Sequence, residues 1–354
     1  MKSVSRRTVT LLAGVTAAAV AVAIVASGAT ARSTQTGRVC VLLPDTVSSV
    51  RWEQFDKPGF IKAFKKAGIP ATVVNALNSQ QKQLAQAEQC INAGAKVGII
   101  TSLDTGTSIA IQKKFAAVGG KTIDYDRQII GGTGSSYVAF DGNNVGRQQA
   151  LGVIGAMKKK GTYKPSGVVA QLWGGPADAN AFWFKSGNDD ILNPLFKSKK
   201  LTKGPAKFVP GWAADKAQVI FEQMLVQTNN NIQGVVAAND NIAGAVIATL
   251  KAKGLKPIPL SGQDNTAAAV QQILAGWQTM TVYKYVPDEV NAAVAAAVAL
   301  YNGKKPARNA TSKGKPAFLI PVTSITKANY TRLFRDGVLK RSEVCTGEYK
   351  QYCK

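Results

Sequence analysis

The sequence contains no histidine among its 354 residues. This absence excludes histidine metal sites, Ser-His-Asp and Cys-His nucleophile systems, and imidazole acid–base chemistry. Acidic residues are also scarce, because 20 Asp and Glu stand against 44 Lys and Arg, a formal net charge of +24. Hydrophobic residues make up 45% and aromatic residues 7% of the chain, which is typical of a globular protein. An enzyme of this composition would have to use carboxylates, lysine or tyrosine.

Hydrophobic runs long enough to span a bilayer are absent, and the longest apolar stretch lies at the N-terminus. A basic stretch at residues 2–7 precedes an apolar run at residues 11–25, which is too short for a membrane span. The Ala-Thr-Ala sequence at residues 29–31 then has the small-residue pattern of a signal-peptidase site. These features predict a signal peptide at residues 1–31 and an exported, soluble mature protein. Residues 5–9 also resemble a twin-arginine signal, so the export route stays open.

The cysteines number four, Cys40, Cys90, Cys345 and Cys353, and disulfides form in the compartments that exported proteins reach. Cys345 and Cys353 close a short loop in a polar tail, so we pair them. Cys40 lies early in a predicted strand and Cys90 late in a predicted helix. Because helices run antiparallel to strands in an α/β layer, a helix end returns to a strand start and the two can meet. The alternative to this second disulfide is a pair of inert buried thiols.

Short β-branched segments alternate with helical segments along the chain, and the alternation occurs in two successive series. The first series predicts strands at residues 39–43, 71–76, 97–101, 122–125 and 137–140, and the second at residues 167–172, 207–209, 234–238, 258–261 and 280–283. Helices are predicted around residues 79–94, 144–158, 213–227, 241–253, 266–275 and 287–301. Such alternation is typical of parallel sheets with right-handed crossovers and helices on both faces. The predicted fold class is therefore α/β, with two doubly wound parallel-sheet lobes.

Polar and aromatic residues follow many of the predicted strands, which is where ligands bind in open parallel sheets. They are Asp45, Arg51, Trp52, Asp124, Asp126, Arg127, Asp178, Asn180, Trp212, Asn239, Asp240, Gln263, Asp264 and Lys284. Carboxylates, amides and guanidinium groups hold sugar hydroxyls with paired hydrogen bonds, and an aromatic ring covers the apolar face of a sugar. The pattern therefore indicates a site for a monosaccharide.

Each of these residues also has a structural interpretation when it is taken alone. The acidic and basic residues at 124–127 could form a local ion-pair group, and the Asn-Asp pair at 239–240 could cap the next helix. Trp212 could pack in a core, and Lys284 could be a solvated strand end. Because sugar-compatible groups recur at strand end after strand end, we favour the binding interpretation over these separate ones.

Several of these residues belong to motifs that occur in the same order in one family. The motifs are Asp45 with Arg51-Trp52, Tyr125-Asp126-Arg127, Gly174-Gly175-Pro176 through Asn180-Ala181, Gly211-Trp212, Ala238-Asn239-Asp240, Ser261-Gly262-Gln263-Asp264 and Gln278-Thr279-Met280-Thr281-Val282-Tyr283-Lys284. The chain resembles the periplasmic sugar-binding proteins of ABC importers, and most of all the D-xylose-binding type, over residues 38–339. It departs from the family pattern at residues 46–50, at Phe182-Trp183-Phe184 and in the added cysteine tail.

The resemblance implies two α/β lobes joined by a three-strand hinge, with the ligand in the interlobe cleft. The chain would cross between lobes near residues 138–141, 279–284 and 320–324. The predicted N-terminal lobe comprises residues 38–140 plus 284–321, the C-terminal lobe residues 141–283 plus 322–340, and a disulfide-closed tail residues 341–354.

The resemblance also implies a set of ligand-binding residues, which we call the predicted binding set. Asp126, Arg127 and Asp264 would hold hydroxyls, Trp212 would stack on the pyranose face, and Lys284 would lie at a hinge. The full set is Arg51, Asp126, Arg127, Asn180, Trp212, Asn239, Asp264 and Lys284.

We therefore expect a non-enzymatic receptor that captures a monosaccharide, xylose or a related aldose, by lobe closure and delivers it to a membrane ABC permease with a cytoplasmic ATPase. We expect a periplasmic monomer without cofactor, metal or nucleic acid, and a chemoreceptor is a further candidate partner. One alternative is a carboxylate-dependent glycoside-processing enzyme that uses Asp126 and Asp264. The other is a basic protein that binds anionic envelope polymers through its lysine clusters.

Overall fold

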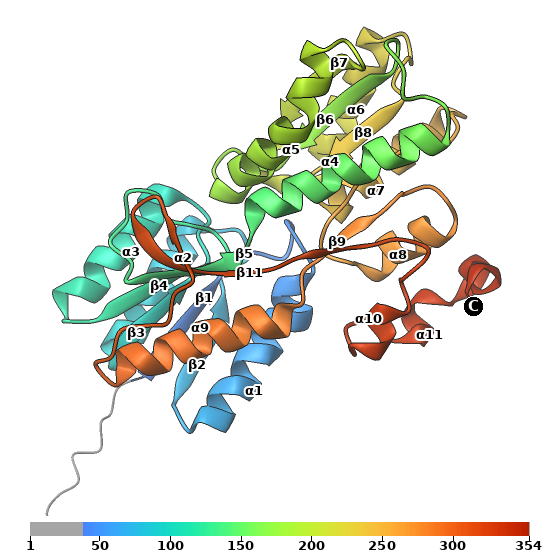
Figure 1. The fold of residues 1–354 in the computed structure, drawn as a ribbon. Coiled ribbons are helices and arrows are strands. Elements are labelled where there is room, and N and C mark those ends of the chain that lie inside the picture. Colours follow the sequence, from blue (N-terminus) through green and yellow to red (C-terminus); the bar gives the residue numbers. More distant parts are fainter. Residues whose placement is uncertain (1–37, 354) are drawn as a thin grey trace, which may run out of the picture. The chain divides into compact units, whose positions relative to one another are not determined.

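The computed structural model describes residues 38–353, and the predicted signal peptide lies outside them. None of the helices within this range combines the length and the apolar character that crossing a membrane requires. The described residues form alternating strands and helices, with three separate sheets (Figure 1).

The largest sheet has seven strands in the order β10-β11-β5-β4-β3-β1-β2. Its strands are β1 (Arg38–Leu43), β2 (Ala71–Asn75), β3 (Ala95–Ile100), β4 (Lys121–Tyr125), β5 (Ser136–Phe140), β10 (Ala310–Ser312) and β11 (Lys315–Ile320). Every pairing is parallel except the one between β10 and β11. We call this sheet and the helices packed on it the first lobe.

Helices cover both faces of this sheet. On one face lie α1 (Lys57–Ala67) and α9 (Val286–Tyr301), and on the other α2 (Gln80–Asn92) and α3 (Thr105–Ala117). Side chains alternate between the faces of a strand, so the apolar sequence of β1 after Arg38 needs a cover on each side. Val41 accordingly packs in one core cluster with Phe60 of α1, and Leu42 in another with Phe115 of α3.

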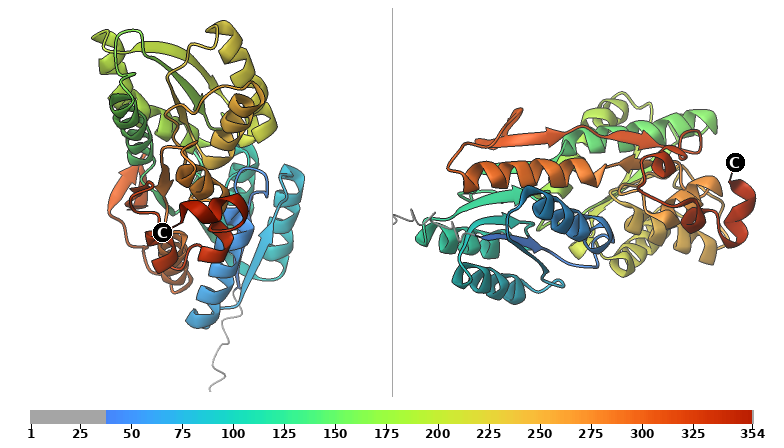
Figure 2. Two further views of the ribbon diagram at one scale, coloured as in Figure 1. Left: turned by 90° about the vertical axis from the view of Figure 1, so that its right-hand side faces the viewer. Right: turned by 90° about the horizontal axis from the view of Figure 1, so that it is seen from below.

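A second, three-stranded parallel sheet has the order β7-β6-β8, and we call it and its helices the second lobe. Its strands are β6 (Val168–Trp173), β7 (Thr202–Phe208) and β8 (Gly234–Ala237). Helices α4 (Gly142–Lys159) and α5 (Ala179–Lys197) lie side by side on one face, as Figures 1 and 2 show, and α6 (Ala214–Gln227) and α7 (Asp240–Ala252) cover the other. The predicted α/β class with two lobes is confirmed.

The chain passes between the two lobes in three places. These are the step from β5 to α4, the step from β9 (Thr281–Tyr283) to α9, and the step from β11 to β12 (Thr323–Ile325). Two crossings contact each other, because the Asp141 amide donates to the carbonyl of Ile320 at 2.9 Å. The predicted lobe boundaries by residue stay a prediction.

Two of the predicted parallel strands are wrong in detail. Residues 258–261 form no strand and make only a single bridge, between Leu260 and Val235, because Pro257 and Pro259 have no amide hydrogen to give to a ladder. The strand predicted at 280–283 does form, as β9, but it pairs antiparallel with β12 instead of joining the parallel sheet. Helices α3 and α5 and strands β10 and β11 were not among the predicted elements.

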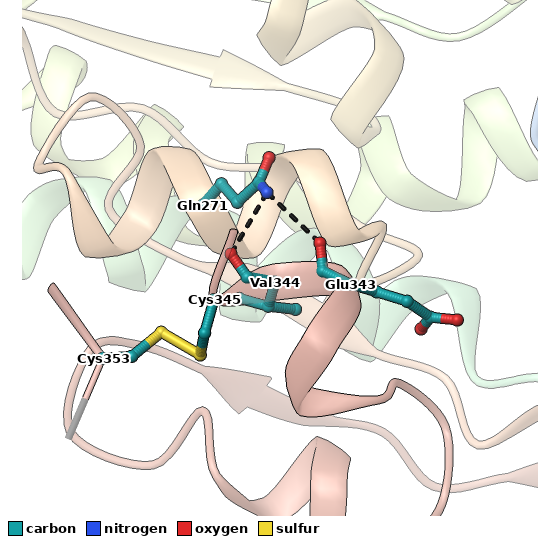
Figure 3. Close-up of a disulfide and its surroundings, with 5 residues drawn as sticks. All are labelled: Gln271, Glu343, Val344, Cys345 and Cys353. Atoms are coloured by element: carbon teal, nitrogen blue, oxygen red, sulfur yellow. Dashed lines mark hydrogen bonds between the residues drawn. A yellow bond between two sulfur atoms is a disulfide. The ribbon is translucent and has the colours of Figure 1, made fainter. Parts of the chain in front are cut away.

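Both predicted disulfides are present, so the alternative of inert buried thiols is wrong. Cys40 of β1 bonds to Cys90 of α2, and Cys345 bonds to Cys353 in the C-terminal tail. The tail contains α10 (Arg332–Arg335), α11 (Arg341–Val344) and η3 (Gly347–Tyr352), and it packs against α8 (Ala267–Leu274). There Gln271 donates hydrogen bonds to two main-chain carbonyls of α11, at 3.2 and 3.1 Å (Figure 3).

Candidate functional site

One cavity is lined by side chains from both lobes and from the crossing after β9. It encloses about 280 Å³ of space, part of it open to solvent. All eight residues of the predicted binding set line it. The complete lining consists of Ser48, Ser49, Arg51, Trp52, Asp126, Arg127, Asp178, Asn180, Phe184, Trp212, Asn239, Gln263, Asp264 and Lys284.

The first lobe contributes three charged side chains to this cavity. Arg51 precedes the short helix η1 (Trp52–Asp56), while Asp126 and Arg127 follow β4 directly. The amide of Asp126 still pairs with the carbonyl of Val138 at 2.8 Å, but its φ of 58° lies in the left-handed region and ends the strand. A non-glycine residue adopts this backbone conformation at some cost, and such strain is common at functional sites.

Arg51 is almost completely buried and paired with carboxylates. Its Nε lies 2.9 Å from Asp56 Oδ2, its Nη2 lies 2.7 Å from Asp56 Oδ1, and its Nη1 lies 2.9 Å from Asp126 Oδ2. Its Nη2 also contacts Glu289 of α9. Burial alone would lower the pKa of Arg51, but these carboxylates raise it well above its ordinary value, so the side chain stays charged.

Asp126 contacts side chains from both lobes and from the crossing after β9. Besides Arg51, it accepts from Asn180 Nδ2 at 2.9 Å and from Lys284 Nζ at 3.2 Å. Burial alone would raise the pKa of Asp126, but the nearby cations outweigh it and lower this pKa to about 2. Asp126 is therefore an ionised acceptor at any physiological pH.

The second lobe contributes its residues from the ends of consecutive strands. Asn180 follows β6 at the start of α5, Trp212 follows β7 in the short helix η2 (Pro210–Trp212), and Asn239 follows β8. Asn239 serves in two ways, because its Oδ1 caps α7 by accepting from the Ile242 amide and its Nδ2 donates to the Ser48 carbonyl, both at 3.0 Å. The capping interpretation is therefore right for this residue, and its role in ligand binding stays a prediction.

Trp212 is buried, and it lines the cavity. Its ring packs edge-on against Phe184, with 6.1 Å between ring centroids, and its Nε1 donates to Asp178 Oδ2 at 3.1 Å. A Cβ on Gly174 would lie 2.1 Å from the indole, so only glycine leaves room for the ring in this place. The interpretation of Trp212 as core packing alone is therefore too narrow.

Arg127 and Asp178 form an ion pair between the lobes, with 2.9 Å between Nε and Oδ2. Asp178 also caps α5 by accepting from the Asn180 amide at 2.9 Å. Burial raises the pKa of Asp178 to about 6, although Arg127 opposes this rise. Asp178 therefore loses its charge at a higher pH when it is buried in this pair than it would in water.

Two buried acceptor oxygens at the cavity have no hydrogen-bond donor among the described residues. They are Gln263 Oε1 and Asp264 Oδ1. Lys284 Nζ approaches Asp264 Oδ1 to 3.7 Å, which is an ion-pair distance but too long for a hydrogen bond. Buried acceptors are nearly always paired, so these two oxygens are suited to hydroxyl donors of a ligand.

The residues at the strand ends fall into two groups, those that line the cavity and those that are paired elsewhere. Asp124 is ion-paired, and it accepts from Gln112 at 2.8 Å, but its cationic partner is Lys315 of β11 and not the neighbouring Arg127 of the supposed local group. Lys284 is 5% exposed, so the interpretation as a solvated strand end is wrong.

Sequence reasoning left six lining residues out of the predicted binding set. Trp52, Asp178 and Gln263 had been noted as strand-end residues, whereas Ser48, Ser49 and Phe184 had not. A signal for the serines does exist, because Asp45 Oδ1 accepts from the amides of Val47 and Ser48 at 2.9 and 2.7 Å and fixes the loop. An Asp side chain that accepts from the backbone amide two residues further on is typical of such a turn.

Comparisons with known proteins agree with this geometry. Residues 39–305 match the family model described as a periplasmic binding protein domain. The D-xylose-binding periplasmic protein of Escherichia coli is 33% identical over 306 residues, which cover 85% of this chain and 90% of that one. The multiple sugar-binding periplasmic receptor ChvE of Rhizobium radiobacter is 28% identical, covering 90% and 95% of the two chains.

Solved structures of solute-binding proteins also have this fold. An ABC transporter solute-binding protein from Clostridium phytofermentans, determined with bound β-D-glucose, aligns with a TM-score of 0.80 at 25% identity, over 86% of this chain and 99% of that one. A carbohydrate transporter solute-binding protein from Chloroflexus aurantiacus, in complex with D-glucose, aligns with a TM-score of 0.78 at 27% identity, over 86% and 97%. With its two lobes, its cavity and these relatives, the chain belongs to the periplasmic binding protein family.

Proposed function

We propose that this chain is the extracytoplasmic receptor of an ABC sugar importer, and that it binds one monosaccharide in the cavity between its lobes. The proposal depends most on the unpaired acceptors Gln263 Oε1 and Asp264 Oδ1, whose residues line the same cavity as Trp212. Hydroxyl groups supply the donors that these oxygens lack, and an indole suits the apolar face of a pyranose.

The proposed cargo is xylose or a related aldose. Relatives named for D-xylose and for multiple sugars support this choice, and so do the solved relatives with bound glucose. Arg127 and Asn180 would add donors to the acceptors of Asp126 and Asp264, so a hydroxyl can both give and receive a hydrogen bond in this cavity.

We further propose binding without turnover. A glycosidase needs one carboxyl group with a raised pKa that protonates the leaving oxygen. Asp126 is the opposite case, since its pKa is lowered to about 2. Asp178 also lines the cavity and has its pKa raised to about 6, but its Oδ1 accepts from the Asn180 amide and its Oδ2 from Trp212 Nε1, so both oxygens are held as acceptors within the protein. The ammonium group of Lys284, 3.2 Å from Asp126 Oδ2, favours Asp126 as an ionised acceptor and not as an acid.

The proposed pathway is export, signal-peptide cleavage, sugar capture by lobe closure, and docking of the closed form on a membrane permease with its ATPase. The sequence of residues 1–31 supports export, and the names of the periplasmic relatives support the compartment. Lobe closure of this kind shifts a population that the free protein already samples. A monomer is the proposed form, and a chemoreceptor is a second candidate reader of the closed form.

Isothermal titration of the mature protein tests the proposal. The protein is unfolded and refolded to remove carried-over sugar, and it is then titrated with D-xylose, D-glucose, D-ribose, L-arabinose and D-galactose. We expect saturable one-to-one binding of at least one sugar with a Kd in the micromolar range or below, and no product on prolonged incubation with aryl glycosides.

The variants Trp212→Ala and Asp264→Ala should lose measurable binding, because one removes the ring and the other an acceptor. Asp190→Ala is the matched control, since Asp190 pairs with Arg147 at the surface, outside the cavity lining. Binding of none of the sugars by the wild-type chain would overturn the proposed cargo, and release of reducing sugar would overturn the receptor role. Attraction to anionic polymers that vanishes in moderate salt would identify that activity as non-specific.

A further inference from the structure

Arg51 is held by more carboxylate groups than its position at the cavity requires. Asp56 takes its Nε and Nη2 in a two-pronged pair, at 2.9 and 2.7 Å, and Glu289 takes Nη2 as well. Asp56 and Glu289 are both fully buried, and neither lines the cavity. These two acids therefore act on the site only through Arg51 and its neighbours.

Glu289 has an unusual place for an acid. It lies in the first turn of α9, where a negative charge stabilises the helix, but the adjacent and exposed Asp288 already supplies that charge. Burial of a carboxyl group costs free energy unless the group is fully paired, and Glu289 Oε1 has no hydrogen-bond partner among the described residues. Helix stability therefore does not account for a buried acid at this position, whereas the contact with Arg51 does.

The two acids and the cavity share the guanidinium group of Arg51 in a defined way. Nε and Nη2 face Asp56 and Glu289, whereas Nη1 faces Asp126 at 2.9 Å on the cavity side. The ring of Trp52 covers the guanidinium face, with 4.5 Å between Cζ and the ring centroid. Because a guanidinium is planar, contacts on its inner edge and its face fix the direction of Nη1.

We propose that Glu289, together with Asp56, is a positioning residue that fixes the guanidinium of Arg51 so that Nη1 points to the bound sugar. The inference depends on the proposed function, because it assigns a role to residues behind the same sugar site. It gives α9, which follows the crossing at Lys284, a part in ligand affinity that acts through Arg51, although none of its side chains is in the cavity lining.

The charge state of Glu289 provides a way to test this role. Burial raises the pKa of Glu289 to about 8, against the opposing effect of Arg51. At pH 7 the group is therefore mostly protonated, and glutamine is its closest substitute in shape and charge. The charged and titratable groups that face it are Arg51, Asp56, Tyr125, Asp126, Tyr137 and Lys284.

The direction in which sugar affinity should change with pH follows from the burial of Glu289. We expect lobe opening to admit water to the cavity side of Arg51, which would reduce the burial that raises the pKa of Glu289. Closure around a sugar then takes up a proton, so closure is favoured below the pKa of the open form and disfavoured as pH rises through about 8. Wild-type affinity should therefore fall several-fold between pH 7 and pH 9.

The experiment is titration calorimetry of three variants with the sugar that the wild-type chain binds. Glu289→Gln keeps an acceptor for Nη2, and we expect affinity within about threefold of wild type at pH 7 and a flatter profile between pH 7 and pH 9. Glu289→Leu keeps the volume without the acceptor, and we expect at least a tenfold loss at pH 7. Glu53→Leu is the matched control from η1, since Glu53 pairs with Lys57 at the surface, and it should bind as the wild type does.

The outcomes separate the inference from the proposed function. Wild-type binding that Glu289→Leu leaves unchanged would overturn the inference and keep the function. Equal losses in the glutamine and leucine variants would also overturn it, because a positioning contact should be rescued by the retained acceptor. If the leucine variant does not fold, the pH profile of Glu289→Gln decides: a fall as steep as in wild type overturns the inference. Absence of sugar binding by the wild-type chain would overturn both.

Discussion

The two arginines at the cavity invite comparison, because they differ mainly in where their partners lie. Arg51 and Arg127 are both buried, both belong to the first lobe, and both have the Trp52 ring beside them, at 4.5 and 5.4 Å from its centroid. Arg51 finds its carboxylates inside the first lobe. Arg127 finds its nearest carboxylate, Asp178, across the cleft at 2.9 Å, whereas Asp45 of its own lobe is 3.6 Å away.

This difference separates two functions of a buried ion pair. Partners within one lobe stay in place when the lobes part, so Arg51 is arranged for the ligand in advance, and less order has to be created on binding. A partner across the cleft is present only when the lobes meet, so the pair of Arg127 contributes to closure itself. Mutations at the two kinds of partner should therefore affect different measurements.

The largest effect of the predicted substitutions should be the loss of thermal stability in Asp56→Asn. Asp56 is fully buried, pairs with Arg51 through both oxygens and accepts from the Tyr125 hydroxyl at 2.6 Å. The substitution removes the one carboxylate that Arg51 contacts through two of its nitrogens, and breaking a buried ion pair costs about 3–5 kcal/mol. We expect the Tm of the sugar-free protein to fall by about 6–12 °C, measured by scanning calorimetry. An unchanged Tm would show that Arg51 is not anchored within its lobe.

Asp178→Asn should have a smaller effect, and it should lower sugar affinity instead of thermal stability. Asparagine is as good a helix cap as aspartate, so the start of α5 is kept while the charge opposite Arg127 is lost. We expect the Tm of the sugar-free protein to stay within about 2 °C of wild type and sugar affinity to fall about tenfold, by about 1.4 kcal/mol. A large fall in Tm without a loss of affinity would contradict the distinction between the two arginines.

The comparison also shows what the sequence could predict. Arg127 follows a predicted strand, and so do most residues of the predicted binding set, because the carboxyl ends of parallel strands gather at one edge of a sheet. Asp56 and Glu289 could not be found in this way. Glu289 lies in an alanine- and valine-rich helix, 238 residues from Arg51, and only the packing of α9 beside η1 brings the two together. Tertiary contacts of this range leave no local pattern.

The errors in the fold have equally local reasons. Residues 258–261 have the composition of a strand, but prolines at 257 and 259 remove the donors that a ladder needs. The strand at 281–283 was placed correctly, yet its partner, β12, lies some 40 residues further along the chain, and a three-residue strand does not specify its direction of pairing. Composition predicts that a strand forms more readily than it predicts which strand lies beside it.

The smallest effect should come from a neutral contact at the rim of the cleft, made by Asn241. Its Nδ2 donates to the Val47 carbonyl at 3.1 Å, across the lobes but outside the cavity lining, and it is half-buried. An exposed neutral hydrogen bond contributes about 0.5 kcal/mol, so Asn241→Ala should weaken sugar binding by about twofold in calorimetry. Asn239→Ala, the buried counterpart that donates to Ser48 at 3.0 Å, should weaken it by about tenfold, since the Ser48 carbonyl then keeps only the longer contact from Asn241 Nδ2 at 3.4 Å. Equal losses of affinity in both variants would contradict this ranking. They would mean that contacts between the lobes contribute equally to sugar affinity whatever their charge and burial.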